Sequence, residues 1–209
     1  MLVPNRIHWL VLPLLVALEA SCGGGHAPAF DDSSTTPDEV AADHRPTSIP
    51  QPNIGNALPM ALSWSGVDAD GHATTAALAD YLDADGTKGI TAILFETVSP
   101  RCGKAREESP ALAAKMAAWR AKGIRVVELV IDDASGGAPT VDSAHQWQMS
   151  AGAAAPVVAD PTFTFSHPGS NPLPVHVVVD PRTLTVLAWT HGADPTFGDV
   201  ETFAAHAAP

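Results

Sequence analysis

The sequence predicts an α/β domain whose central mixed sheet is parallel in its first half, ends in an antiparallel hairpin, and is flanked by helices. Three observations support this class. Apolar, β-branched runs alternate with helical segments through the middle of the chain, as in parallel βαβ units. The last two apolar runs are joined by a tight turn at residues 180–183, which favours antiparallel pairing. Hydrophobic residues make up 45% of the 209-residue chain, enough for the core of one ordinary domain.

The first elements are expected between residues 60 and 86. Residues 60–73, MALSWSGVDADGHA, predict a short strand followed by a turn at Asp70-Gly71. Residues 74–86, TTAALADYLDADG, predict a short helix that is capped by one of its two leading threonines and ends at its final glycine.

The remaining elements follow from periodicity and from start and stop signals. Three of them are helices: a long one with Leu112, Met116 and Trp119 on one face and Gly123 after its end, one opened by Thr140, and one capped by Asp199. The predicted segments, in order, are a strand at 90–96, a helix at 104–122, a strand at 124–132, a helix at 141–149, strands at 175–180 and 184–189, and a helix at 199–206.

The N-terminus has the features of an export signal. Arg6 precedes the apolar run IHWLVLPLLVAL, which is too short to span a bilayer comfortably. The following EASCGGG resembles the lipobox of bacterial lipoproteins, although Glu19 stands where an aliphatic residue is preferred. That resemblance implies a signal peptide at residues 1–21, a lipid-anchored Cys22, and, with Gly23 next, an outer-membrane location if the envelope is Gram-negative. Plain secretion or release into the periplasm, and an uncleaved anchor, are the alternatives. All of them place the domain outside the cytoplasm.

Residues 22–57 predict a flexible acidic tether, and residues 58–209 predict the folded domain. The tether is rich in Gly, Pro, Ser, Thr and Asp and poor in large apolar residues, so it cannot bury enough surface to offset its ordering entropy. The whole chain has 11 basic and 23 acidic residues, a formal net charge of −12. This charge argues against nucleic acid or an anionic membrane surface as an electrostatic partner.

One turn carries the motif on which a functional hypothesis depends. Ser99-Pro100-Arg101-Cys102 follows a predicted buried strand and opens the long helix, and Leu173-Pro174 precedes a later strand. This ordered set resembles the thioredoxin-like superfamily, closest to its redoxin branch of alkyl hydroperoxide reductases, thiol-specific antioxidants and membrane-anchored thioredoxins. The resemblance covers residues 58–207. It implies a thioredoxin-like fold in which Pro174 is cis and faces the turn.

In that superfamily the turn usually reads Cys-x-x-Cys, and a thiolate in the first position is stabilised by the helix N-terminus. Aligned on this pattern, Ser99 occupies the first position and Cys102 the second, one turn into the helix. Ile93 stands six residues before Ser99, where thioredoxins commonly keep a buried acid. Cys22 is not expected to pair with Cys102, because a long tether separates them and lipidation would consume its thiol. A cycling dithiol is therefore not expected.

The resemblance implies single-thiol redox chemistry with a protein thiol or disulfide partner in the envelope. Cys102 would form a mixed disulfide or be oxidised, Ser99 would hydrogen-bond its thiolate, and Pro174 would shape the partner groove. One alternative is a non-catalytic binding module that keeps the fold. The other is a one-Cys peroxidase, which Ser99 fits, whereas Phe95 and Pro174 stand where that branch expects a proline and an arginine.

Two further residues are secondary candidates. Arg101 is adjacent to Cys102 and could lower the pKa of its thiol. His176 points to the same face as Pro174 by strand parity and could act as a base or a soft-metal ligand, although an ordinary strand histidine is the simpler interpretation. The pair Glu107-Glu108 is expected on the solvated surface of the long helix. The sequence predicts neither a metal site nor a cofactor.

Overall fold

The computed structural model describes residues 52–166 and 172–207. The predicted signal peptide, Cys22 and the tether up to residue 51 lie outside the described residues. Within the described part, seven strands form one mixed sheet, accompanied by four helices. The strands are β1 (Ser63–Val67), β2 (Ala73–Ala77), β3 (Ala92–Val98), β4 (Ile124–Val130), β5 (Val157–Ala159), β6 (Val175–Val179) and β7 (Val186–His191). The helices are α1 (Leu78–Tyr81), α2 (Gly103–Ala121), α3 (Val141–Ala151) and α4 (Gly198–Ala207).

The sheet has the strand order β2-β1-β5-β4-β3-β6-β7. Its middle is parallel, because β4 pairs in parallel with both β3 and β5. Its C-terminal side is antiparallel, because β6 runs against β3 and β7 runs against β6. The predicted mixed sheet with an antiparallel C-terminal hairpin is therefore confirmed.

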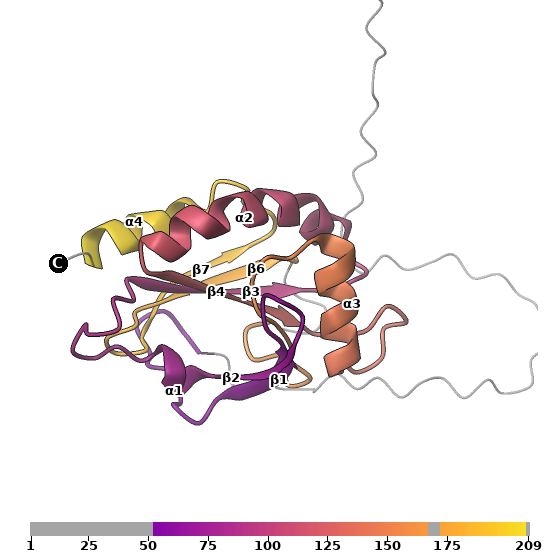
Figure 1. The fold of residues 1–209 in the computed structure, drawn as a ribbon, viewed down its shortest axis with the longest axis horizontal. Helices are drawn as coiled ribbons and strands as arrows, with labels where there is room; N and C mark the ends of the chain where they lie inside the picture. The colour runs from indigo at the N-terminus through magenta and orange to yellow at the C-terminus, as the bar shows by residue number, and fades with distance from the viewer. Residues whose placement is uncertain (1–51, 167–171, 208–209) are drawn as a thin grey trace, which may run out of the picture.

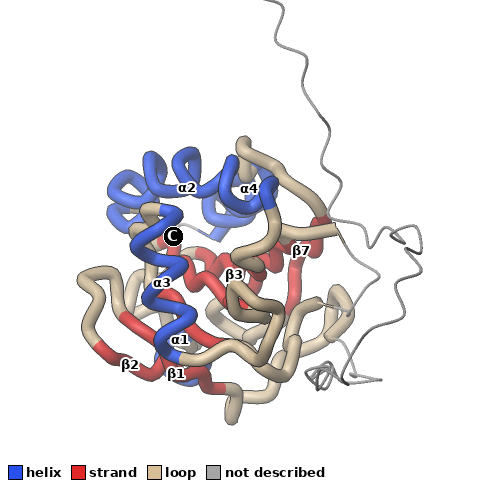
Figure 2. Tube along the Cα trace, turned by 90° about the vertical axis from the view of Figure 1, so that its right-hand side faces the viewer, coloured by secondary structure: helices blue, strands red, loops and turns tan. Residues whose placement is uncertain are grey.

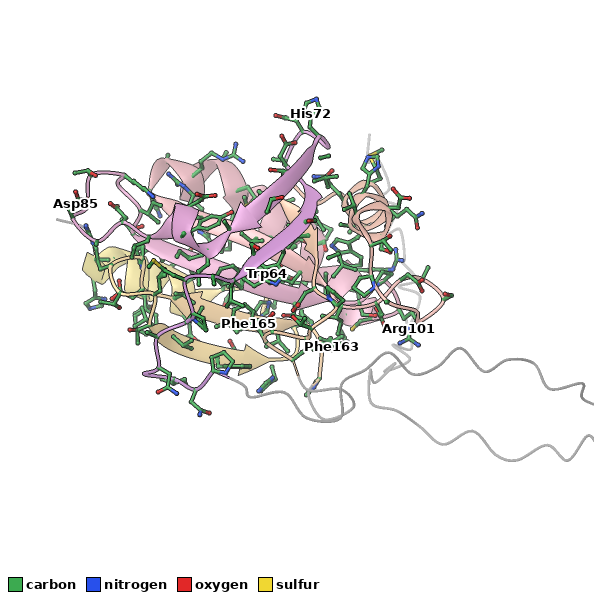
Figure 3. The ribbon with its side chains drawn as sticks, turned by 90° about the horizontal axis from the view of Figure 1, so that it is seen from below. Trp64, His72, Asp85, Arg101, Phe163 and Phe165 are labelled. Atoms are coloured by element: carbon green, nitrogen blue, oxygen red, sulfur yellow. The ribbon has the colours of Figure 1, made fainter. Side chains whose placement is uncertain are left out.

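The two faces of the sheet are covered by different elements. Helices α2 and α4 lie together over one face, and β1, β2 and α1 curl round on the other side (Figures 1 and 2). Strand β3 shows the division: Ala92 and Leu94 pack in the cluster under α2 and α4, whereas Ile93 and Phe95 pack in the opposite cluster. That opposite cluster contains Trp64, which lies in the middle of the molecule in Figure 3.

The prediction of a short helix at residues 74–86 is largely wrong. Thr74 and Thr75 belong to β2, which pairs antiparallel with β1, and helical structure is limited to Leu78–Tyr81 without a side-chain cap. The Asp68 carboxylate accepts the backbone N–H groups of Asp70 and His72 and so fixes the hairpin turn. Pairing with β1 outweighs the weak helix preference of this segment, and β-branched threonines suit a strand.

The two longer predicted helices are confirmed. Thr140 caps α3 through a reciprocal pair of bonds with Ser143, and α2 ends just before Gly123, whose φ of 84° is in the left-handed region. The last helix begins at Gly198, so Asp199 lies within its first turn and does not cap it.

The chain joins the sheet a little earlier than residue 58. Ala57 bridges Thr185, and the Gly55 N–H donates to the Val186 carbonyl at 2.8 Å, so the end of the predicted tether lies along the chain leading into β7. Among the described residues, no helix combines the length and the apolar character needed to cross a membrane.

Candidate functional site

The turn between β3 and α2 presents Cys102 at the start of a helix. Strand β3 ends at Val98, α2 begins at Gly103, and Cys102 is its N-cap residue. The Cys102 N–H donates to the Ser99 carbonyl at 2.9 Å, and the Ser99 hydroxyl accepts the Arg101 N–H at 3.1 Å. The sulfur is therefore carried at the helix end where unpaired N–H groups and the helix dipole favour negative charge.

This position corrects the alignment made from the sequence alone. Cys102 was expected one turn inside the helix, with Ser99 at its entrance. Instead Cys102 stands at the entrance, and the residue one turn later is Ala105, which is fully buried. Ser99 lies in the turn before the helix. Measured from Cys102, the residue six positions earlier is Glu96, a fully buried acid.

The loop before β6 faces this turn as expected. The Leu173-Pro174 peptide bond is cis, and the Cys102 sulfur lies 3.5 Å from the Leu173 carbonyl oxygen. The Cys102 residue is only 3% exposed and packs in an apolar cluster with Val98 and Ala105. Turn and proline loop, 71 residues apart in the chain, thus meet at the sulfur.

Cys102 is disulfide-bonded in the structure, and the part of the chain that is described contains no free cysteine. The chain's other cysteine, Cys22, lies outside the described residues.

Arg101 is engaged away from the sulfur. Its guanidinium donates to Asp132 Oδ2 through Nε at 3.1 Å and through Nη2 at 2.6 Å. The neighbouring Arg106 donates through two nitrogens to the Pro100 carbonyl, at 3.1 and 2.9 Å. Both arginines therefore hold the turn in shape by bonds to oxygen atoms.

A row of ionisable side chains lies under α2, on the same face of the sheet. Glu96 on β3 is paired in register with Glu128 on β4 and with His176 on β6. Glu108 on α2 reaches the same place: its Oε1 lies 3.2 Å from His176 Nε2, which is 3.9 Å from Glu96 Oε1. All four residues are at most 4% exposed.

Burial dominates the electrostatics of this row. It raises the pKa of Glu96 well above the usual value, and the negative charges of Glu128 and Glu108 add to the effect. It also raises the pKa of Glu128 to about 7, although the bond that Trp147 Nε1 donates to the Glu128 carboxylate at 2.7 Å opposes the shift. These carboxyl groups therefore hold protons at a higher pH than exposed ones.

One sequence expectation is corrected by this row. Glu108 is 3% exposed and does not belong to the solvated helix surface, whereas Glu107 is exposed and contacts Lys104. His176, a secondary candidate from the sequence, faces Glu108 and Glu96. The signal for Glu108 was available in the spacing, because Ala105, Glu108 and Leu112 recur at helical intervals on the buried face of α2.

A cavity of about 590 Å³ opens beside the turn, between it and α3. Pro100 and Arg106 line it from the turn and α2, and Trp147 and Met149 line it from α3. The Arg106 guanidinium lies 5.6 Å from the centre of the Trp147 ring, and Met149 is 73% exposed. The turn is thus bordered by an open, partly apolar surface.

Comparison with solved structures identifies the fold. A protein of Chlorobium tepidum described as a thiol:disulfide interchange protein DsbE matches with a TM-score of 0.54 and 20% identity, over 76% of this chain and 100% of that one. A thiol:disulfide interchange protein from Bacteroides sp. matches at 0.52 and 19%, over 74% and 91% of the two chains. A reduced 2-Cys peroxiredoxin from Plasmodium vivax matches at 0.54 and 13%, over 73% and 97%.

No protein-family model matches the sequence, and comparison with curated proteins gives no match. The structural similarity, together with the mixed sheet and its flanking helices, shows that the chain has the thioredoxin-like fold.

Proposed function

We propose that this chain is an extracytoplasmic, lipid-anchored protein of thioredoxin or redoxin type that carries out thiol–disulfide exchange with a protein partner through a single thiol, that of Cys102. The observation that carries the proposal is the position of Cys102, at the N-cap of α2 and 3.5 Å from the carbonyl that precedes the cis proline. The structural relatives named for thiol:disulfide interchange support the same chemistry by analogy of fold.

The exchange follows from sulfur chemistry. A thiol reductant first releases Cys102 from its disulfide. The Cys102 thiolate, stabilised by the amide groups of the first turn, then attacks one sulfur of the partner's disulfide. A bond forms between Cys102 and that sulfur, and the partner's second sulfur leaves as a thiolate. Because Ala105 occupies the position one turn later, the turn supplies no second sulfur, and the mixed disulfide persists until an external thiol attacks it.

The surroundings give the remaining residues their roles. Ser99 shapes the turn by accepting the Arg101 N–H, and in this proposal its hydroxyl hydrogen-bonds the Cys102 thiolate. Pro174 would shape the partner groove, because the Leu173 carbonyl that precedes it lies 3.5 Å from the sulfur. The cavity lined by Pro100, Trp147 and Met149 provides a partly apolar surface for an extended partner segment.

Mixed-disulfide trapping tests this function. The chain carrying Cys22→Ser is reduced, freed of reductant and exposed to oxidised glutathione, and the adduct is followed by mass spectrometry. We expect one glutathione per folded chain, at Cys102, and none in the Cys102→Ser, Cys22→Ser counterpart, which has no cysteine. Adduct formation only after addition of denaturant would contradict the proposal.

One observation favours a second function, a binding module without covalent chemistry. Cys102 is only 3% exposed and packs among apolar side chains, as a structural cysteine does. In that case a partner would occupy the same cavity, and Cys102→Ser would leave its affinity unchanged. If the Cys102→Ser variant loses binding, and no other residue at position 102 restores it, the thiol function is favoured.

The lipid anchor is tested separately, at residue 22. Mass spectrometry of the mature protein from its own envelope should find an acylated Cys22 as the first residue. An unmodified terminus at any other position would refute the anchor and leave a secreted or periplasmic protein.

A further inference from the structure

The buried row under α2 contains a set of side-chain atoms that no hydrogen bond satisfies. Among the described residues, both carboxylate oxygens of Glu96, Oε2 of Glu108 and Nε2 of His176 are buried without a hydrogen-bond partner. Buried polar atoms in native proteins are nearly always paired, and leaving one unpaired costs about 1–3 kcal/mol. Several unpaired atoms that converge on one point therefore require an explanation.

Their arrangement suits a metal ion. One donor atom each from Glu96, Glu108 and His176 lies within 4.8 Å of the other two. Zinc binds nitrogen and oxygen at about 2.0–2.2 Å, so donors on one tetrahedral ion stand about 3.3–3.5 Å apart. The 3.2 Å and 3.9 Å separations from His176 Nε2 to the two carboxylates bracket this spacing.

Charge balance agrees with a divalent ion. Two carboxylates and a neutral imidazole around a 2+ ion give a neutral buried group, whereas uncompensated carboxylates in an apolar interior are strongly unfavourable. One imidazole with two carboxylates suits a borderline first-row ion such as Zn²⁺ better than Ca²⁺ or Mg²⁺, which prefer oxygen alone.

Neighbouring groups fix the orientation of these side chains. The Asp194 N–H donates to Glu108 Oε1 at 3.1 Å, and the Phe197 ring packs edge-on against His176 at 5.4 Å between centroids. Hydrogen bonds from neighbouring groups to the ligand side chains, like the one that Asp194 donates to Glu108, are a usual feature of protein metal sites. The ligands themselves come from three elements, β3, α2 and β6, which one ion would tie together.

We infer that Glu96, Glu108 and His176 form a buried site for one divalent transition-metal ion, with Zn²⁺ as the favoured class member. The ion joins the strand and the helix on either side of the Cys102 turn to the strand that follows Pro174. The site is independent of the thiol chemistry, because none of its donor atoms is sulfur.

Direct metal measurement tests the inference. The full chain is produced with Zn²⁺ in the medium, and its metal content is compared with that of chelator-treated protein returned to Zn²⁺ alone. We expect one Zn²⁺ per chain and a thermal midpoint that rises with the Zn²⁺ concentration. A wild-type chain that retains no Zn²⁺ under either condition overturns the inference.

Matched variants locate the ion. Glu108→Gln and His176→Gln should each weaken Zn²⁺ binding by at least about tenfold, the scale at which ligand-shell changes act. The control is His72→Gln, which alters the exposed group Asp68, Asp70 and His72 and should bind Zn²⁺ as the wild type does. Loss of binding in His72→Gln with retention in His176→Gln would place the ion on the exposed group and overturn the inference.

A spectroscopic readout covers the case in which the buried variants do not fold. Wild-type chain loaded with Co²⁺ should show the visible bands of an oxygen and nitrogen site and no thiolate-to-metal charge-transfer band. A charge-transfer band would put the ion on cysteine and contradict the inference. Because Cys102→Ser should leave Zn²⁺ binding unchanged, failure of the metal site and failure of the thiol function are distinguishable.

Discussion

Asp83 shows at the scale of one residue how a carboxylate organises a connection. It is 1% exposed, and its two oxygens accept the N–H groups of Lys88 and Ile90, each at 2.9 Å. Its own N–H donates to the Pro181 carbonyl at 2.8 Å, and its carbonyl accepts Arg182 Nη1 at 3.0 Å. The side chain of Asp83 thereby fixes the chain entering β3, and its backbone ties the same segment to the turn between β6 and β7.

This arrangement predicts a pH-dependent stability. Burial opposes ionisation of Asp83, but the N–H groups of Lys88 and Ile90 outweigh it and hold the pKa of the carboxyl below its usual value. A lowered pKa in the folded state contributes stability above the unfolded value of about 3.9, and that contribution disappears as the pH falls through the folded value. Asp83→Asn should therefore destabilise the protein at pH 7, and its difference from wild type should shrink below about pH 4.

Urea unfolding at pH 7 and at pH 3.5 measures the two differences. A gap between wild type and Asp83→Asn that stays constant over this range would show that the charge of Asp83 is not what stabilises the connection.

Some residues of the candidate site could be predicted from the sequence, and others could not. The cis Pro174 and the meeting of its loop with the Cys102 turn were implied by the resemblance to the thioredoxin-like superfamily, and both are found. The start of α2, predicted at residue 104, is within one residue of the observed start at Gly103. The error came from matching Ser99-x-x-Cys102 to the Cys-x-x-Cys pattern, which assigns Ser99 and not Cys102 to the helix N-terminus. Glu108 was missed because adjacent glutamates on a helix point about 100° apart, so that one can be exposed and its neighbour buried.

At the scale of elements, Gly66 sets how closely β1 approaches β5. Gly66 lies on β1 and pairs with Thr74 on β2 on one side and with Val158 on β5 on the other. A Cβ at this position would stand 2.1 Å from the Val157 carbonyl oxygen, and backbone atoms cannot move aside cheaply. Gly66 is therefore required because the strands approach closely. Its φ is not in the left-handed region, so backbone conformation does not demand a glycine here.

Gly66→Ala is expected to destabilise the protein by roughly 1–3 kcal/mol, the usual cost of overpacking. Ser65→Ala, one residue earlier on the exposed face of β1, is the matched control and should change stability by less than about 0.5 kcal/mol. Chemical denaturation of the two variants provides the measurement. Equal stability of both would mean that β1 and β5 are not held in this register.

Prediction of the elements succeeded where the pattern was long. The buried strands near 92–98 and 124–130 are largely apolar runs, and the helix at 103–121 is marked by Leu112, Met116 and Trp119 on its buried face. The sequence does not predict strand β5, because three residues are too few for a periodic signal. It predicts a helix in place of β2, because the pairing of β2 with β1 is not visible in the local sequence. Both errors concern pairings that only the assembled sheet supplies.

At the scale of the whole molecule, the sheet brings distant segments to one place. β3 leads into the Cys102 turn, β6 follows Pro174, and the two strands are antiparallel neighbours, so the turn and the proline loop lie at the same edge of the sheet. The order of elements predicted this fold, although not the N-terminal hairpin. What order cannot give is the register of α2 on the sheet, and the identity of the reactive position depends on that register.

Cys102 occupies the position of the nucleophile, and Ala105 occupies that of the missing second sulfur. Two variants test these assignments, Ala105→Cys and Ser99→Cys, each made in the Cys22→Ser chain, reduced and then given one equivalent of oxidised glutathione. We expect Ala105→Cys to resolve the mixed disulfide, release glutathione and close a disulfide with Cys102, while Ser99→Cys keeps the adduct as the parent chain does. Release by Ser99→Cys together with a persistent adduct in Ala105→Cys would contradict these assignments.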